Sequence, residues 1–150
     1  MSRIYMKIQL LQKEFLAPSY KTEGAAGMDI YLQEDTTLVI GSNNTIHLGF
    51  RAEVPQGYVA VLVPRSSIGI KGIGLRNTVG IIDSDYRGEW VANITIDEQG
   101  SNAWGDVLNF KKGDRLLQCL LLPVQHEAIE VVDSLSETAR GSGGFGSTGA

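Results

Sequence analysis

The 150-residue chain has little cysteine, little histidine and no long apolar run, and each shortage excludes a class of protein. A single cysteine, Cys119, cannot form an internal disulfide, so we expect a reducing, cytoplasmic environment. Two histidines far apart in the sequence give no zinc-site pattern. No apolar stretch approaches the ~18 residues that cross a membrane. Because Arg3, Lys7 and Lys13 interrupt the early apolar runs, we also expect no signal peptide.

An excess of positive charge is missing as well. Lysine and arginine number 13 against 17 aspartates and glutamates, which gives a net charge of −4. A broad basic surface for nucleic acid is therefore not expected. An acidic protein that binds phosphates must concentrate its few cations locally or use a metal. The hydrophobic content of 43% and charged content of 20% are typical of one globular domain.

A sustained helical repeat of apolar residues is also absent, and at most Ser66–Lys71 predicts one helical turn. Instead, 18 glycines separate short apolar or alternating runs, and Pro55-Gln56-Gly57 predicts a hairpin. The expected strands are Ile4–Leu11, Met28–Leu32, Thr36–Ile40, Thr45–Val54, Tyr58–Val63, Trp90–Ile96, Asp106–Phe110, Arg115–Val124 and Ala128–Val132. This pattern predicts an all-β protein with a jelly-roll-like antiparallel β domain.

One of these strands is apolar at nearly every position from Leu116 to Leu122. Such a strand is covered on both faces, either as the central strand of a sandwich or by a neighbouring subunit. No linker interrupts the chain before about Glu137. We therefore expect a β domain over residues 1–136 and a flexible C-terminal arm over residues 137–150.

The arm ends in Arg140-Gly-Ser-Gly-Gly-Phe-Gly-Ser-Thr-Gly-Ala150. Glycines let backbone amides approach an anion, Arg140 is a bidentate donor for phosphate, and Phe145 offers a flat face to a base. A Gly/Ser tail is otherwise a floppy terminus, but linkers seldom contain an arginine or an aromatic ring. A P-loop is excluded because Ser147 replaces its lysine and no helix follows. The tail is predicted to close over a nucleotide.

Three other segments carry polar groups next to predicted strands. Asp29, in AAGMDI, suits a metal or its waters, although an isolated aspartate is more often a turn cap. In PRSSIG, Arg65, Ser66 and Ser67 offer a guanidinium, two hydroxyls and backbone N–H groups to one anion; a helix cap beside a surface arginine is the alternative. Gln118, in GDRLLQ, interrupts an apolar row and so needs a partner in the core or on a ligand.

The segment Asn77–Trp90, NTVGIIDSDYRGEW, is the densest in functional groups. Asp83 and Asp85 share a strand parity and would face one way if the segment were extended. One of them would act as a base while the other caps the turn or pairs with an arginine. Tyr86 could pack flat on a sugar, and Asn77 has the donor and acceptor that suit a pyrimidine edge.

Together and in this order, AAGMDI, PRSSIG, NTVGIIDSDYRG, GDRLLQ and RGSGGFGSTG resemble the trimeric deoxyuridine triphosphate nucleotidohydrolases (dUTPases). The resemblance spans Ala25 to Gly149. It implies hydrolysis of dUTP to dUMP and pyrophosphate, with Mg²⁺ bound across the triphosphate. It also implies a homotrimer with three shared active sites.

The resemblance assigns a role to each motif. Asp83 would hold the attacking water and contact the sugar 3′-hydroxyl, and Tyr86 would pack on the deoxyribose and exclude a 2′-hydroxyl. The uracil edge would be read in a narrow hairpin pocket by Asn77 and backbone groups of Gly80, Ile81 and Ile82, with Val91 on its wall.

The remaining roles implied by the resemblance concern the phosphates. Asp29 would lie near the metal's water shell. The phosphate site would consist of Arg65, Ser66, Ser67 and Gln118. Phe145 would cover the uracil. The arm would close on the phosphates through Arg140, Gly146, Ser147 and Thr148.

Two positions depart from the family pattern. Asp114 stands where glutamate is common, and Ser142 stands where an acidic residue is common. Neither change touches the implied chemistry. The segment Asp97–Asp106 belongs to no motif and receives no role.

Two rival functions remain open at this point. A dCTP deaminase shares the fold but expects a catalytic glutamate in the third motif; IDSDYRG favours hydrolysis, although Glu89 lies nearby. A non-catalytic nucleotide sensor on the same fold is the other rival. Intact Asp83, Tyr86 and tail favour catalysis over that role.

Overall fold

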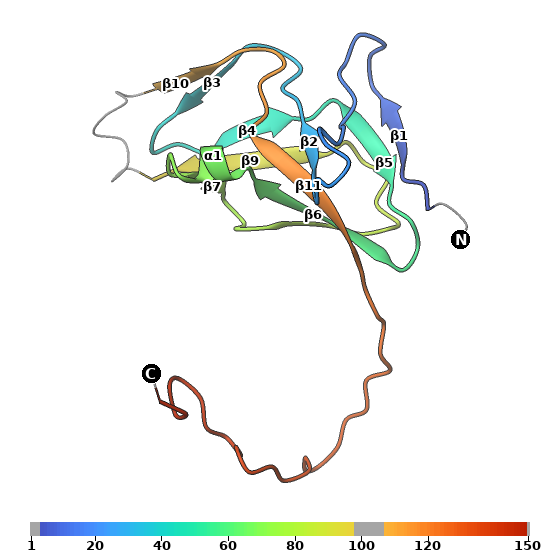
Figure 1. The fold of residues 1–150 in the computed structure, drawn as a ribbon, viewed down its shortest axis with the longest axis vertical. Coiled ribbons are helices and arrows are strands. Elements are labelled where there is room, and N and C mark those ends of the chain that lie inside the picture. The colour runs from blue at the N-terminus through green and yellow to red at the C-terminus, as the bar shows by residue number, and fades with distance from the viewer. Residues whose placement is uncertain (1–3, 98–106, 150) are drawn as a thin grey trace.

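The computed structural model describes residues 4–97 and 107–149, which are almost entirely β (Figure 1). The elements are β1 (Lys7–Leu10), β2 (Met28–Ile30), β3 (Thr36–Val39), β4 (Asn44–His47), β5 (Phe50–Glu53), β6 (Tyr58–Pro64), α1 (Ser66–Gly69), β7 (Ile73–Leu75), β8 (Gly80–Ile82), β9 (Val91–Ile96), β10 (Val107–Phe110) and β11 (Leu117–Pro123). The expected all-β class and the single helical turn after Arg65 are confirmed. Within the described ranges, no helix is long and apolar enough to cross a membrane.

The strands form antiparallel sheets that enclose one apolar core. A four-stranded sheet has the order β2-β11-β6-β8, a three-stranded sheet has the order β4-β9-β7, and β1–β5 and β3–β10 form pairs. Phe50 and Trp90 pack at the centre with their rings 5.0 Å apart. β11 lies between β2 and β6, so the apolar run Leu116–Leu122 belongs to a central strand.

Cys119, in β11, is completely buried. Burial raises the pKa of its thiol to about 12, so it is protonated at neutral pH and behaves as a small apolar core residue.

Several strand boundaries differ from those predicted. The expected strand Thr45–Val54 is divided into β4 and β5, because Gly49 adopts a left-handed φ of +79° between them. The turn at Pro55–Gly57 forms, with Tyr58 N donating to Pro55 O at 3.1 Å, but it joins strands that pair with different partners and so makes no hairpin. β7 and β8 escaped prediction because three residues are too few to show a period of two.

The chain leaves the sheets after β11 and curves away from the β domain as a long tail (Figure 1). The expected strand Ala128–Val132 is not formed, and its residues are exposed. The last strand thus ends at Pro123, upstream of the expected boundary at residue 136, and the division into domain and arm stays a prediction. The first residue of the expected strand Asp106–Phe110 lies outside the described residues.

Candidate functional site

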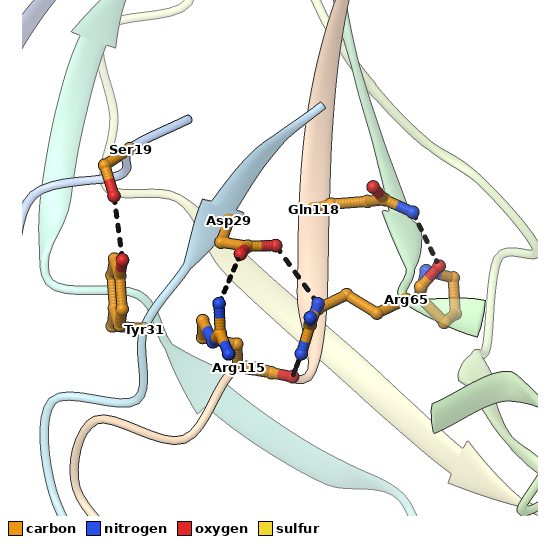
Figure 2. Close-up of polar contacts among 7 residues, drawn as sticks. Ser19, Asp29, Tyr31, Arg65, Arg115 and Gln118 are labelled. Atoms are coloured by element: carbon orange, nitrogen blue, oxygen red, sulfur yellow. Dashed lines mark hydrogen bonds and ion pairs between the residues drawn. The ribbon is translucent and has the colours of Figure 1, made fainter. Parts of the chain in front are cut away.

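Four residues from three distant motifs meet at one end of the four-stranded sheet (Figure 2). Asp29 Oδ1 accepts Arg65 Nε at 3.1 Å, and Asp29 Oδ2 accepts Arg115 Nη1 at 2.8 Å. Arg65 Nη1 also donates to the Arg115 carbonyl at 3.3 Å, and Gln118 Nε2 donates to the Pro64 carbonyl at 3.5 Å. We call Asp29, Arg65, Arg115 and Gln118 the anion cluster.

The strand register explains why these residues meet. Gln118 of β11 stands opposite Asp29 of β2 on one side and Val63 of β6 on the other. Residues directly opposite in an antiparallel pair point to the same face, so Asp29 and Gln118 share a face. Arg65 lies two residues beyond Val63. The Asp29 backbone is further fixed by two hydrogen bonds with Ser19.

The anion cluster keeps a surplus of positive charge. Asp29, which is 7% exposed, is one carboxylate against two guanidiniums. Arg65 and Arg115 line a depression of about 320 Å³ together with Lys71 and one carboxylate, Asp114. Ser66 and Ser67 open α1 beside it, and no side chain caps that helix's first turn. The site therefore offers charge, hydroxyls and N–H donors to an anion.

Sequence reasoning did not single out Arg115 or Lys71. Arg115 lies in the motif GDRLLQ, so a search for cations inside the motifs would have found it. Lys71 carries no such signal; only the fold places it beside the depression.

A second group of predicted residues lies along β8 and the turn before it. Asn77 is exposed, and the next residue, Thr78, has a φ of +69°. A β-branched residue in that region costs about 1–3 kcal/mol and is typical of functional turns. β8 pairs with β6 and is the edge strand of its sheet.

The strands on either side of the expected uracil pocket, β8 and β9, do not pair with each other. Among the described strands, β8 pairs only with β6, whereas β9 pairs with β4 and β7. Val91, at the start of β9, is 41% exposed and pairs with His47. The backbone N–H and C=O groups on the outer edge of β8 thus pair with no described strand.

A tight turn follows β8 and carries the remaining polar residues. Tyr86 N donates to Asp83 O at 3.2 Å, so Asp83 and Asp85 lie in a turn and not in an extended strand as their parity suggested. The side chains of both aspartates are exposed. They line a groove of about 780 Å³, which also includes Ile81, Tyr58 and His126.

The two groups lie at opposite ends of β6. Ile82 pairs with Ala60, so Asp83 lies beside Val59, whereas Arg65 follows the far end of the strand. Six residues of strand separate them, which corresponds to about 20 Å. One copy of the chain therefore does not bring Asp83 and Arg65 to the same phosphate.

The predicted arm residues form a third group, away from the β domain (Figure 1). Phe145 is fully exposed, and Arg140 Nε donates to Gly143 O at 2.9 Å. Short turns order the glycine-rich end, including one between Gly144 and Ser147. The tail therefore has local structure, although its composition suggested none.

The sequence and the fold were compared with those of known proteins. The dUTPase family model matches residues 13–149. The chain belongs to the dUTPase family. Deoxyuridine 5'-triphosphate nucleotidohydrolases from Nautilia profundicola and Roseobacter denitrificans are 40% and 42% identical to it, over 96% and 88% of this chain and 98% and 86% of theirs. A structure of the Staphylococcus bacteriophage 80alpha dUTPase with dUPNHPP is 25% identical, with a TM-score of 0.84, covering 97% of this chain and 99% of that one.

Membership of the dUTPase family relates the three groups of residues to one another: the anion cluster, the turn after β8 and the arm all contain motifs of this family. The structure brings Asp29, Arg65 and Gln118 together and leaves the Asp83 turn and the arm apart from them. The five motifs are thus three separate surfaces on a single copy of the chain.

Proposed function

We propose that this protein hydrolyses dUTP to dUMP and pyrophosphate by attack of an Asp83-held water on the α-phosphate. The observation that carries the proposal is the match to dUTPases over nearly the whole chain, with every motif present. The relatives are named for this reaction, and the phage enzyme was solved with the dUTP analogue dUPNHPP. Hydrolysis would limit uracil in DNA and supply dUMP.

The uracil edge is read by Asn77 and by backbone groups of Gly80, Ile81 and Ile82. Support comes from the position of β8 at a sheet edge, where its outer N–H and C=O groups face no described strand. Val91 forms part of the pocket wall. A wrong base leaves a buried donor or acceptor unpaired, which costs about 1–3 kcal/mol.

Asp83 orients and deprotonates the attacking water and contacts the 3′-hydroxyl. Its exposed position in a groove beside the turn leaves the carboxylate accessible to substrate. Tyr86 lies on the deoxyribose and excludes a 2′-hydroxyl. A positioned base of this kind contributes roughly 10²–10⁴-fold to a rate.

The phosphates are bound by the anion cluster and the neighbouring hydroxyls. Arg65 is preorganised by Asp29 and so needs no rearrangement when charge develops on the phosphates. Ser66, Ser67 and Gln118 add neutral donors. Phe145 covers the uracil, and the arm donates from Arg140, Gly146, Ser147 and Thr148 when it closes.

Mg²⁺ fits this site as an ion held mainly by the substrate. Within residues 4–97 and 107–149, no three His, Cys, Asp or Glu side chains gather to hold a metal. Mg²⁺ commonly binds one or two carboxylates plus substrate phosphates, and keeps several waters. Each Asp29 oxygen accepts one arginine and retains a second acceptor position for a water of that shell. When bound, the ion would neutralise charge on the triphosphate.

The working unit is a homotrimer with shared sites. The separation of about 20 Å along β6 between Asp83 and Arg65 supports a site that is completed by a second copy. The course of the arm, which curves away from its own β domain in Figure 1, supports contact with another copy. In the tail segment between β11 and the arm, the exposed apolar residues Ile129, Val131 and Leu135 suit burial against a neighbour. A cytoplasmic location accompanies this role and is supported by the single free cysteine, Cys119.

Complementation tests the shared site. Asp83→Asn and Arg65→Gln are each expected to be inactive alone. Mixed trimers, reassembled from both variants, should regain activity because some sites then combine an intact Asp83 with an intact Arg65. No recovery in verified mixed trimers would show that one copy supplies both residues.

The deaminase alternative is disfavoured by the position of Glu89. Its carboxylate is bound by His47 Nδ1 at 2.5 Å, and its side chain is 24% exposed. Ammonia release from dCTP would nevertheless overturn the hydrolase assignment.

The test of the function is pyrophosphate release from dUTP, dTTP, dCTP and UTP with Mg²⁺, beside Asp83→Asn. Release from dUTP alone, lost in the variant while binding persists, is the expected result. Binding without release in the wild type would indicate a nucleotide sensor. Wild-type turnover by Asp83→Asn would remove Asp83 from the mechanism.

A further inference from the structure

The turn after β8 wraps around the ring of Tyr86. We call Asp83–Glu89 the sugar loop. Tyr86 N donates to Asp83 O, and Tyr86 Oη donates to Glu89 O at 3.0 Å. A Cβ on Gly88 would lie within 2.9 Å of three atoms of the Tyr86 side chain. The Tyr86 ring thus packs directly on the Gly88 backbone, and this contact sets the position of the opposite face of the ring.

Arg87 holds the backbone of the sugar loop. Its Nη1 donates to Ser84 O at 2.7 Å and to Tyr86 O at 3.2 Å, so a single guanidinium group binds carbonyls on both sides of the turn. Hydrogen bonds with an ionised donor are about twice as strong as neutral ones. Ser84 follows the proposed base Asp83 directly, and Tyr86 is the residue proposed to lie on the sugar.

The guanidinium acts from outside the nucleotide groove. Asp83 lines the groove of about 780 Å³, whereas Arg87 lines a separate depression of about 350 Å³ formed with β1 and β5. There Arg87 Nε lies 4.0 Å from Glu53 Oε1 of β5. Glu53 is in turn paired with Lys7 of β1 at 2.9 Å. A long, half-exposed ion pair thus links the sugar loop weakly to a strand pair of the β domain.

We propose that Arg87, through its hydrogen bonds to the Ser84 and Tyr86 carbonyls, is a positioning residue that sets the discrimination between deoxyribose and ribose. The proposal rests on the proposed function, in which Tyr86 lies on the sugar. Exclusion of a hydroxyl by shape requires a rigid wall, and Tyr86 is 45% exposed with its ring and hydroxyl held by Gly88 and Glu89 of the sugar loop itself. The position of the ring therefore depends on the rigidity of that loop. The two contacts from Arg87 to the Ser84 and Tyr86 carbonyls restrain the loop. Such restraint matters because displacements of about 1 Å in an active site can change rates 10²-fold.

Arg87→Met tests this directly, because it keeps the length of the side chain and removes its donors. We expect the ratio of kcat/KM for dUTP over UTP to fall about tenfold. We expect hydrogen exchange at the Tyr86 amide to accelerate by a similar factor, as the turn loosens. Arg87→Lys, which keeps the charge but not the fork, should recover only part of both effects.

Lys7→Met is the matched control, because Lys7 also pairs with Glu53 but touches no part of the sugar loop. It should leave the ratio and the exchange rate unchanged. Glu53→Gln should lower the dUTP/UTP ratio of kcat/KM by threefold or less. In the Arg87→Met background the same substitution should cause no further fall, because Glu53 acts only through Arg87 and the two residues are coupled.

A dUTP/UTP ratio within twofold of wild type in folded Arg87→Met would overturn the proposal. If Arg87→Met does not fold, an unchanged ratio in folded Arg87→Lys overturns it equally. If the wild type releases no pyrophosphate from dUTP, the proposed function fails. Amide exchange at Tyr86 then still decides whether Arg87 restrains the sugar loop.

Discussion

The anion cluster and the C-terminal arm each contain arginine that we propose binds phosphate, but they are built in opposite ways. In the cluster, Asp29 and Arg115 are 86 positions apart and meet at 2.8 Å in a part-buried site. In the arm, Arg140 and Phe145 are near neighbours in sequence, and Arg140 hydrogen-bonds to Gly143 within the same segment. The contacts of the cluster are already formed in this structure, whereas the arm, in our proposal, contacts substrate only when it closes.

This difference separates two energetic roles. A preorganised site stabilises charge without reorganising during the reaction. A glycine-rich arm gives up conformational entropy when it closes, roughly 1–2 kcal/mol per ordered residue, and so closes only when its ligand repays that cost. We therefore expect changes in the cluster to affect stability, and changes in the arm to affect turnover alone.

The largest expected effect comes from deleting residues 140–150. Turnover of dUTP should fall about 100-fold or more, because closure and phosphate alignment are lost. The melting temperature and the trimer should not change, since the deleted residues lie beyond the last strand, which ends at Pro123. Loss of the trimer on gel filtration would show instead that the tail is structural.

Asp29→Asn, in the anion cluster, should have the next largest effect, and the quantity that it changes is stability. Removing the carboxylate leaves Arg65 and Arg115 without their counter-charge and should lower the free energy of unfolding by about 2–3 kcal/mol. That corresponds to a fall in Tm of roughly 5–10 °C. Asp133→Asn removes an exposed carboxylate from the tail segment between β11 and the arm; it is the control and should not change Tm in the same calorimetric scan.

Phe145→Ala should reduce kcat/KM for dUTP about tenfold, because stacking of a base on an aromatic ring contributes about 1–3 kcal/mol. Its Tm should equal that of the wild type, since the ring is fully exposed. Ser142→Ala, three positions earlier, should have little effect on either quantity. Equal losses of kcat/KM in the two variants would remove the stacking role.

The smallest effect should come from a pair of glycines. A Cβ on Gly27 would lie 2.8 Å from Gln118 Oε1, whereas a Cβ on Gly144 would meet nothing within 4 Å. Gly27→Ala should therefore shift the Gln118 amide and lower Tm by roughly 2–4 °C, for a cost of about 1 kcal/mol. Gly144→Ala should leave Tm unchanged. Equal Tm values would indicate that Gln118 moves aside freely.

Much of the fold was predictable because its signals are local. Alternating apolar runs and glycine-containing turns gave most of the strands and the all-β class, and the helical turn after Arg65 was found where expected. The errors have local causes too: Gly49 divides one expected strand, and β7 and β8 are too short to show a period. Ala128–Val132 alternates like a strand but finds no partner strand among the described residues.

For the site, the sequence was sufficient to identify the family and the motif residues, because a motif is a property of neighbours along the chain. It also established that phosphate binding needs a local concentration of cations in an acidic protein. Only the tertiary structure decided that Asp29 is shared by two arginines and that Arg115 belongs with them. Only the structure decided that Asp83 and Arg65 lie at opposite ends of β6. Strand register fixes which distant residues face one another, and a side chain's own neighbours in sequence carry no record of it.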